Sequence, residues 1–339
     1  MIKIAVLYRK TTETDKKYPY DYMGRGTSRH VQRVHNILQA KGYASSIVEL
    51  DMDSYERLKN ENYDLVFNLC DDGFRDDPLL EAHIPALLDI LAVPYTGSGV
   101  LTLATCVNKA RTKEVLAYHR IMTPAFQLFY RDDEPLNPEL QFPLIVKPNH
   151  EDASIGIRRE SVVKDDNELR QQIYVVHSNY QQPALVEQFI NGREVYVGIL
   201  GAWENLTILP LTEVMFDQNL KQDARICTYE SKWMAQSEQY KNTTVQCPAL
   251  LDKELQEKVV AIAKEAYKIF YCRDYSRIDF RIDEKGQPFI LEINPNPDIS
   301  EDAGVARMAK AAGINYEELV ERIAVSALER SQLLQVKKR

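Results

Sequence analysis

The sequence predicts a mixed α/β (α+β) protein with more than one domain, and three observations support this fold class. Apolar segments of strand length alternate with helical patterns over roughly the first hundred residues, which is typical of a parallel α/β domain. Near the C-terminus, residues 277–297 have the period-two alternation and the central turn of a β-hairpin. The 339 residues are enough for two or three domains with substantial cores.

Composition argues against several classes of protein. The net charge of −8 disfavours general affinity for nucleic acid or for an anionic membrane surface. The five cysteines form no CxxC pair, so we expect free thiols in a reducing cytosol and a cytoplasmic protein. Met1 leads directly into a strand without a signal peptide, and no apolar run has the length that a bilayer span needs.

The N-terminal elements are expected in alternation. Lys3–Tyr8 is an almost continuous apolar run, which indicates a strand that is buried on both faces. This run is not followed by a GxGxxG motif, so a dinucleotide-binding fold is disfavoured. The expected order is then a helix ending near 40–42, a strand at 46–50, a helix at 55–59, a strand at 65–69 and a helix at 79–91.

The remaining chain continues as strands and helices around two polar segments. The segment 142–148 is an apolar strand that carries Lys147 near its end, and a polar loop follows at 149–156. The region 217–247 is polar, irregular and too long for an ordinary connection, which is typical of an active-site flap. The other expected elements are helices at 107–120, 166–180, 253–269, 303–312 and 316–334, and strands at 184–187, 195–200 and 206–211.

The expected hairpin carries the first candidate site. A two-residue turn at 285–286 places Asp279 opposite Glu292, ~5 Å apart on one face. The same register places Arg277 opposite Asn294. Two carboxylates and an amide oxygen are ligands that Mg²⁺ accepts, and a neighbouring arginine suits a phosphate or an oxyanion. The alternative is a charged, solvated face with structural ion pairs, which is the commoner origin of such an isolated set.

Further segments form an ordered set with this hairpin. The set consists of PYTGSG (94–99), NKARTK (108–113), PLIVKP (143–148), EDASIG (151–156), VEQFINGREV (186–195), YESKW (229–233) and RIDFRIDEKGQPFILEINPNP (277–297). It covers nearly the whole chain and resembles the ATP-grasp superfamily, in particular its D-alanine–D-alanine ligase-like branch. The resemblance implies a three-domain ATP-grasp fold in which two sheets sandwich ATP. The domains would be an N-terminal parallel α/β domain at 1–105, a central subdomain at 106–185 and a C-terminal subdomain with the metal site at 186–339.

The resemblance also implies a role for each candidate residue. Lys109 and Lys147 would bind the ATP phosphates, although a solvated Lys109 is an equal alternative on the residues alone. The loop at 151–156 would fold over the phosphates, with Ser154 among the ATP-binding residues. The adenosine would contact Glu187, Phe189, Ile190 and Glu194. Lys232 and Arg277 would be catalytic, and Asp279, Glu292 and Asn294 would hold the metal.

The implied function is the ATP-dependent, ADP-forming ligation of a carboxylate to an amine through an acyl phosphate. ATP and Mg²⁺ are the implied cofactors, with Mn²⁺ as a substitute, and the partners are small-molecule carboxylate and amine substrates. A homodimer through the N-terminal domain is left open. Two alternative functions also stay open: an ester-forming ligase that uses a hydroxy acid, and an ATP-binding regulatory or scaffold protein without ligase activity.

The substrate half of the expected site departs from the pattern of D-alanine ligases. Ala153 and Ala303 replace serines, Trp233 replaces a tyrosine, and Asp298 replaces a glycine. A methyl group cannot anchor a carboxylate, so we expect poor turnover of D-alanine alone while ATP binding is kept.

In the N-terminal domain, Glu13 is a candidate for binding the first substrate's ammonium, beside an insert at 16–26. Four acidic residues either face an amine-bearing substrate or are solvated: Asp71, Asp72, Asp76 and Asp77.

Overall fold

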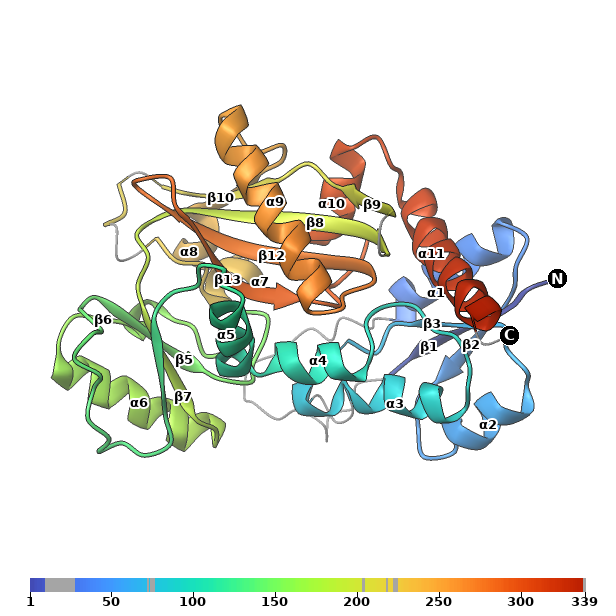
Figure 1. Cartoon of the computed structure of the whole chain (residues 1–339), viewed down its shortest axis with the longest axis horizontal. Coiled ribbons are helices and arrows are strands. Elements are labelled where there is room, and N and C mark those ends of the chain that lie inside the picture. The colour runs from blue at the N-terminus through green and yellow to red at the C-terminus, as the bar shows by residue number, and fades with distance from the viewer. Residues whose placement is uncertain are drawn as a thin grey trace.

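The computed structural model describes residues 1–9, 28–71, 73, 77–202, 205–217, 219–221 and 225–337, without the side chains of residues 28 and 332–337. Glu13, the insert at 16–26, Asp72 and Asp76 therefore lie outside the described residues. Three sheets build the molecule: the N-terminal sheet lies on the right of Figure 1, the central sheet at the lower left and the C-terminal sheet above. No helix in the described part of the chain is long and apolar enough to cross a membrane.

The N-terminal sheet is parallel, as the alternation of elements predicts. Its strand order is β2-β1-β3, formed by β1 (Lys3–Tyr8), β2 (Ala44–Glu49) and β3 (Leu65–Asn68). The central strand β1 is buried on both faces, because Ile4 and Val6 pack into one hydrophobic cluster and Ala5 and Leu7 into another. The helices of this region are α1 (Ser28–Ala40), α2 (Ser54–Asn60), the 3₁₀ helix η3 (Pro78–Leu80) and α3 (His83–Ile90).

The helix expected at 107–120 is confirmed over Lys109–Tyr118, and an unexpected helix precedes it, with a break in the chain at Asn108 between the two. α4 (Val100–Val107) ends where Asn108 adopts an extended conformation, and α5 (Lys109–Tyr118) begins at the next residue. The Asn108 side chain accepts a hydrogen bond from the N–H of Arg111 (3.0 Å) and so caps α5. The cap fixes the first turn of α5, which carries one of the candidate phosphate-binding lysines.

The central sheet is antiparallel and has one covered face. Its strand order is β4-β7-β5-β6, formed by β4 (Phe126–Phe129), β5 (Leu144–Pro148), β6 (Val162–Val163) and β7 (Ala184–Gln188). The short 3₁₀ helix η4 (Arg159–Ser161) precedes β6, and α6 (Asp166–Tyr180) covers one face, where Val146 and Val186 are buried. Because side chains alternate along a strand, Lys147 and Glu187 point to the opposite face.

The C-terminal sheet is antiparallel and presents its charged face to the central sheet. Its order is β11-β10-β8-β12-β13, with β9 paired to β8; the strands are β8 (Gly192–Ala202), β9 (Asn205–Ile208), β10 (Thr212–Phe216), β11 (Thr243–Gln246), β12 (Asp274–Asp283) and β13 (Pro288–Asn294). α9 (Lys253–Ile269) covers the other face, where Val197, Ile278 and Phe280 are buried. Two antiparallel sheets facing each other confirm the predicted ATP-grasp architecture.

The region 217–247 contains more regular structure than the expected irregular flap. It includes α7 (Tyr229–Trp233), α8 (Glu238–Lys241) and the edge strand β11. Thr228 and Ser237 cap the two helices with their hydroxyl groups, so short polar sequences are held in helical form. The expectation of an irregular segment is therefore wrong for these elements, which form a cover over the sheet face.

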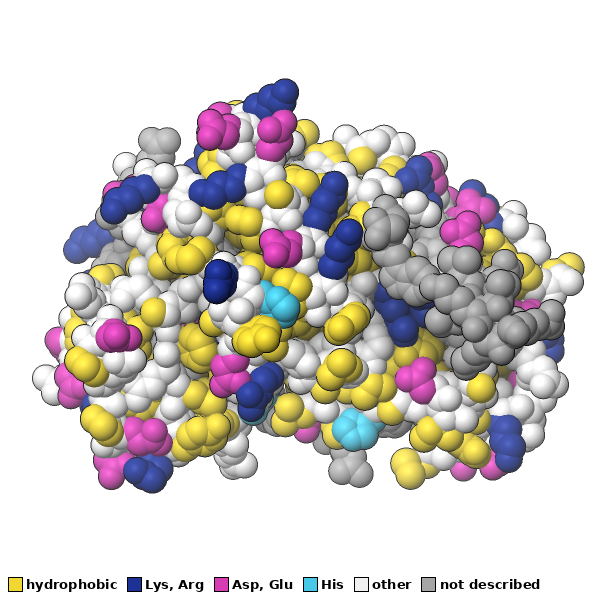
Figure 2. All heavy atoms as spheres, in the orientation of Figure 1, with side chains coloured by type: hydrophobic (Ala, Val, Ile, Leu, Met, Phe, Trp, Pro, Cys, Tyr) yellow, Lys and Arg dark blue, Asp and Glu magenta, His cyan; other side chains and the backbone are white. Residues whose placement is uncertain are grey.

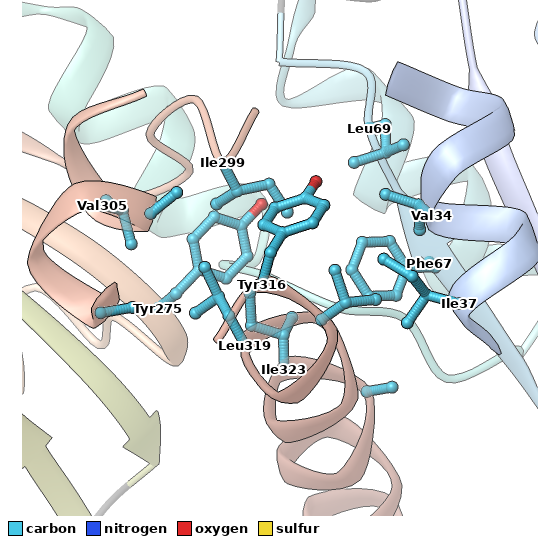
Figure 3. Packing of buried hydrophobic residues seen from close by; sticks show 14 of the residues in the cluster. Val34, Ile37, Phe67, Leu69, Tyr275, Ile299, Val305, Tyr316, Leu319 and Ile323 are labelled. Carbon is cyan, nitrogen blue, oxygen red and sulfur yellow. The ribbon is translucent and has the colours of Figure 1, made fainter. Parts of the chain in front are cut away.

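One hydrophobic core joins the N-terminal and C-terminal parts of the chain. α10 (Gly304–Ala311) and α11 (Tyr316–Lys337) follow the last strand, and α11 packs between the two parts. Figure 3 shows side chains of α11 between those of the N-terminal sheet and α1 on one side and those of the C-terminal region on the other. A buried ion pair between Arg330 of α11 and Asp274 of β12 (2.8 Å) strengthens this contact.

Candidate active site

The β12–β13 hairpin has the expected register at its functional end, although its turn differs from the prediction. Arg277 lies opposite Asn294, and Asp279 lies opposite Glu292. The turn spans residues 283–287, where the N–H of the first residue bonds to the carbonyl of the last (3.1 Å), so it has one residue more than expected. The predicted register at the four site residues is confirmed, and the two-residue turn is wrong.

A β-bulge at Leu291 reconciles the longer turn with this register. Asp279 pairs with Glu292, but the next residue, Phe280, pairs with Ile290. Leu291 is therefore left without a partner on the other strand, and the pairing shifts by one residue. Ile290 is fully buried in the core under α9, whereas Leu291 lines the cleft between the two sheets. The bulge therefore puts an apolar side chain beside the carboxylates.

Arg277 is held rigidly beside these carboxylates. Its Nε and one terminal nitrogen donate to the two oxygens of Asp279 (2.7 and 2.8 Å), and its guanidinium lies over the Tyr196 ring at 5.0 Å. On the other side of the hairpin, Lys109 Nζ lies 3.4 Å from the Glu292 carboxylate. Cationic side chains from β12 and α5 thus converge on a pair of acidic groups.

The two carboxylates differ in how readily they bind a proton. Burial raises the pKa of Asp279 to about 6, despite its bidentate contact with Arg277. Burial alone would also raise the pKa of Glu292, but Lys109, Lys232 and Arg277 outweigh it and hold that pKa well below the ordinary value. Glu292 therefore keeps its charge to a lower pH than Asp279 does.

The donor set fits Mg²⁺ when phosphate oxygens complete it. Among the described residues, no group of three His, Cys, Asp or Glu side chains is placed to hold a metal ion by itself. Asp279, Glu292 and Asn294 supply two carboxylates and one amide, and Mg²⁺ in nucleotide sites is bound by one or two carboxylates together with phosphates and water. The Asn294 amide lies 3.3 Å from Asp279 and 3.4 Å from Glu292, so its oxygen can face the same point after an amide rotation.

A buried ion cluster lies across the cleft on the central sheet. Lys147 Nζ is 2.7 Å from one oxygen of Glu187, and Lys113 Nζ is 2.8 Å from the other. Lys113 also donates to the Thr123 hydroxyl (2.8 Å) and is fully buried. Burial lowers the pKa of Lys113 to about 8, whereas the two lysines together overcome burial and lower the pKa of Glu187. The Glu187 carboxylate, expected to contact the adenosine, is thus engaged in positioning Lys147.

The expected ATP-binding residues come together in one narrow cavity between the two sheets. All seven line it: Lys109, Lys147, Ser154, Glu187, Phe189, Ile190 and Glu194. Glu194, also expected to contact the adenosine, is bound by Arg281 (3.0 Å) and by the Tyr196 hydroxyl (2.6 Å). The cavity also reaches Lys232, Asp279 and Glu292, so it connects the nucleotide side to the hairpin.

The loop after β5 is linked to the flap. Ala153 and Ser154 both have positive φ (51° and 63°), which side chains other than glycine rarely adopt. Gly156 is also at positive φ, and a Cβ there would lie 2.5 Å from Pro148. The indole nitrogen of Trp233 donates to the carbonyl oxygen of Ala153 (3.0 Å), so α7 closes directly onto this loop.

A larger cavity of 860 Å³ adjoins the nucleotide cavity. Lys232, Glu292 and Tyr196 line both, so the two cavities meet where the transferred phosphate is expected. The altered positions of the substrate half all line the larger cavity: Ala153, Trp233, Asp298 and Ala303. Of the expected acidic cluster, Asp71 also lines it, whereas Asp77 accepts a hydrogen bond from the N–H of Leu79 and caps η3.

Three site residues were missed on the sequence, and two carried a usable signal. Lys113 lies one helical turn after Lys109 in the NKARTK segment, so both lysines lie on one face of α5. Tyr196 lies two residues after Glu194 on one strand and therefore on the same face of the sheet. Thr212 lines the larger cavity from β10, and nothing in its sequence neighbourhood points to that place.

Comparison with known proteins agrees with this geometry. The family model described as D-ala D-ala ligase C-terminus matches residues 115–325. The D-alanine–D-alanine ligases of Bordetella avium and Geotalea uraniireducens are 32% and 34% identical to this chain, covering 90% and 88% of it and 93% and 90% of their own lengths. The structure of the Bacillus anthracis D-alanine–D-alanine ligase complexed with ATP superposes with a TM-score of 0.75 at 22% identity, covering 98% of this chain and 99% of that one. The chain therefore belongs to the D-alanine–D-alanine ligase family and is an ATP-dependent, ADP-forming ligase of the ATP-grasp fold.

Proposed function

We propose that this enzyme joins two amino acids into a dipeptide, with D-alanine as the carboxylate donor. The observation that carries the proposal is the junction of the two cavities, where Lys232 and Glu292 line both the nucleotide side and the substrate side. A donor carboxylate in the larger cavity would meet the terminal phosphate of ATP at this point. The names of the relatives supply D-alanine as the substrate to test first.

Phosphate binding is assigned to lysines from three different elements. Lys109 on α5 and Lys232 on α7 line both cavities, and Lys147 on β5 lines the nucleotide cavity beside them. Compact ammonium groups suit phosphate oxygens, and charges fixed in a water-poor cleft stabilise a transferring phosphoryl group strongly. The reaction needs positioning and electrostatic stabilisation, which these side chains supply.

The hairpin residues are assigned to the metal and to the oxyanion. Asp279, Glu292 and Asn294 would hold the metal against the phosphates. A bound Mg²⁺, or Mn²⁺ in its place, would supply positive charge at the phosphate oxygens. Arg277, fixed by Asp279 and by the Tyr196 ring, would stabilise the oxyanion that forms at the acyl carbon.

The chemical steps need no nucleophile from the protein. A carboxylate oxygen of the donor attacks the γ-phosphorus, the bond to the bridging oxygen breaks, and ADP leaves. The amine of the acceptor then attacks the acyl carbon, phosphate leaves with the bonding electron pair, and the amine proton passes to solvent. Burial raises the pKa of Cys227, the cysteine between the two cavities, which keeps its thiol protonated and unsuited to attack.

The acceptor is proposed to differ from D-alanine. Ala153 and Ala303 offer methyl groups to the cavity, and the Trp233 indole is already bonded to the loop carbonyl. These side chains provide no anchor for the carboxylate of a small acceptor. The names of the relatives, in contrast, give D-alanine for both positions, and the experiment below separates the two possibilities.

The test is ADP release with D-alanine alone and with D-alanine plus each member of an amino-acid panel, with mass spectrometry of the product. We expect weak ADP release with D-alanine alone and a mixed dipeptide with a larger acceptor. Efficient synthesis of D-alanyl-D-alanine at millimolar D-alanine would contradict the proposed acceptor. A hydroxy acid in the panel tests the ester-forming alternative, and no ADP release with any pair would contradict the proposed function.

Three expectations about the whole protein remain proposals. The first is the division at 1–105, 106–185 and 186–339, although β7 (Ala184–Gln188) runs across the last boundary. The second is a cytoplasmic location.

The third is a homodimer through the N-terminal domain: Figure 2 shows hydrophobic side chains over the face that holds α3 and α4, where Ile90 and Leu101 are 74% and 67% exposed. Light scattering of the purified protein would test the dimer.

A further inference from the structure

The larger cavity extends beyond the space that two small amino acids need. Two alanine molecules need about 360 Å³, at roughly 30 Å³ for each non-hydrogen atom, and a phosphate group adds about 150 Å³. The cavity has 860 Å³. From the hairpin the cavity extends in two directions: toward the N-terminal region, where Asp71, Glu81 and Leu103 line it, and under the flap helices over the outer strands β10 and β11 of the C-terminal sheet.

This flap end of the cavity has an apolar floor and wall. Val214 of β10 and Val245 of β11 lie directly opposite each other in the sheet, and both line the cavity. Tyr240 of α8 covers them from the flap and is 44% exposed, so this end opens to solvent. Such a channel accommodates an aliphatic chain, because it removes apolar surface from water along its length.

A buried hydroxyl without a partner also lines the cavity. Thr212 is only 2% exposed, and its Oγ1 has no hydrogen-bond partner within the described residues. Thr212 lies opposite Tyr196 in the sheet, beside the ring on which Arg277 rests. Leaving a buried polar group unsatisfied is costly, so this hydroxyl marks a position where a ligand polar atom would be favoured.

Two cations from different elements line the larger cavity. Lys241 of α8 and Arg307 of α10 line the cavity, one from the flap and one from the C-terminal helices. Arg307 donates to the backbone carbonyl of Asp302 (2.5 Å), which fixes its guanidinium near the start of α10. Within the described part of the chain neither side chain forms an ion pair, so both remain able to bind an anion.

We propose that the flap end is the side-chain subsite of the acceptor and that it takes an acidic amino acid. Val214, Val245 and Tyr240 would pack on the aliphatic stem, and Lys241 and Arg307 would bind the terminal carboxylate. The inference rests on the proposed ligation of two amino acids and deepens it by naming the class of acceptor. Glutamate, in the enantiomer that the enzyme selects, is the probe for this class.

The first experiment compares glutamate, glutamine and alanine as acceptors, in both enantiomers, with ATP and D-alanine as the donor. Glutamate and glutamine have the same length and differ in charge, so their ratio isolates the two cations. We expect a kcat/KM for one enantiomer of glutamate at least tenfold above those for glutamine and alanine. Equal or higher values for alanine, with ADP still formed, would overturn the subsite and leave the proposed function standing.

The second experiment uses variants of the subsite. Arg307→Gln and Lys241→Gln should each lower kcat/KM for glutamate about tenfold and leave the preference between glutamine and alanine unchanged. Thr212→Val, which keeps the shape and removes the hydroxyl, should lower the values for both glutamate and glutamine. Lys310→Gln is the matched control, because Lys310 is exposed on α10 outside the cavity. Unchanged glutamate kinetics in Arg307→Gln and Lys241→Gln would overturn the proposal.

A binding measurement separates failure of the inference from failure of the ligase function. Calorimetry with glutamate and a non-hydrolysable ATP analogue does not depend on the donor or on turnover. Glutamate binding that weakens about tenfold in Arg307→Gln supports the subsite even if D-alanine is the wrong donor. If glutamate does not bind while D-alanine pairs release ADP, only the subsite is refuted. If glutamate does not bind and no pair releases ADP, both proposals are refuted.

Discussion

Replacing Glu187 with glutamine should destabilise the protein far more than replacing Lys113 with methionine. The cluster contains two cations, Lys113 and Lys147, and a single anion, with contacts of 2.8 and 2.7 Å. In Lys113→Met one cation and one anion remain, so the charges still balance. The loss is then one or two hydrogen bonds, about 1–2 kcal/mol. In Glu187→Gln two buried ammonium groups face each other without a counter-ion, and the expected loss is about 3–5 kcal/mol.

The assay is urea-induced unfolding followed by far-UV circular dichroism, for the wild type, each single variant and the double variant. Because Lys113 is the partner that has no route to solvent, removing it should recover part of the loss caused by Glu187→Gln. The double variant should therefore be more stable than the sum of the two single effects predicts. Equal destabilisation by both single variants, or strict additivity in the double variant, would refute the charge-count argument.

Three further predictions concern the metal site, the phosphates and pH. Glu292→Gln should keep the fold but nearly abolish ADP formation, whereas the turn variant Glu284→Gln should not; near-normal turnover in the first would remove Glu292 from the metal site. Lys147→Ala should weaken ATP binding by about 1.5–3 kcal/mol, and unchanged affinity by calorimetry would place this lysine outside the phosphate site. The pKa of Lys113 is lowered from 10.5 to about 8 in the folded protein, so the native state loses this proton first and the unfolding free energy should rise with pH between these values. Lys113→Met should lack that rise, and identical pH profiles for the two proteins would contradict the assignment.

The sequence predicted the arrangement of the strands better than the path of the chain between them. The alternation of elements was sufficient to predict the parallel N-terminal sheet. Apolar residues such as Ile4 and Leu7 lie on opposite faces of β1, so the sequence already indicated a strand that is buried on both faces. The hairpin register was right at Asp279 and Glu292 although the turn was wrong. The bulge at Leu291 restored the pairing that a shorter turn would have given.

The missed features depend on tertiary contacts or on weak local signals. Lys113 and Glu187 are more than 70 positions apart, and no local pattern reveals that they pair. The two flap helices depend on single capping side chains, Thr228 and Ser237, which carry little weight against a long polar sequence. A positional role for Thr212 requires knowing which strands are neighbours in the sheet.

The division of the hydrophobic cores indicates which part of the molecule moves when the nucleotide binds. The core around α11 fuses the N-terminal sheet and the C-terminal sheet into one body, whereas the core under α6 contains residues of the central region alone. Among the described residues, a small apolar cluster around Val162, Phe189 and Ile226 connects the central sheet to the flap. Separating so little apolar surface costs far less than disturbing either large core. We therefore expect the central sheet to rotate about a hinge as one rigid body, while the rest of the chain moves little.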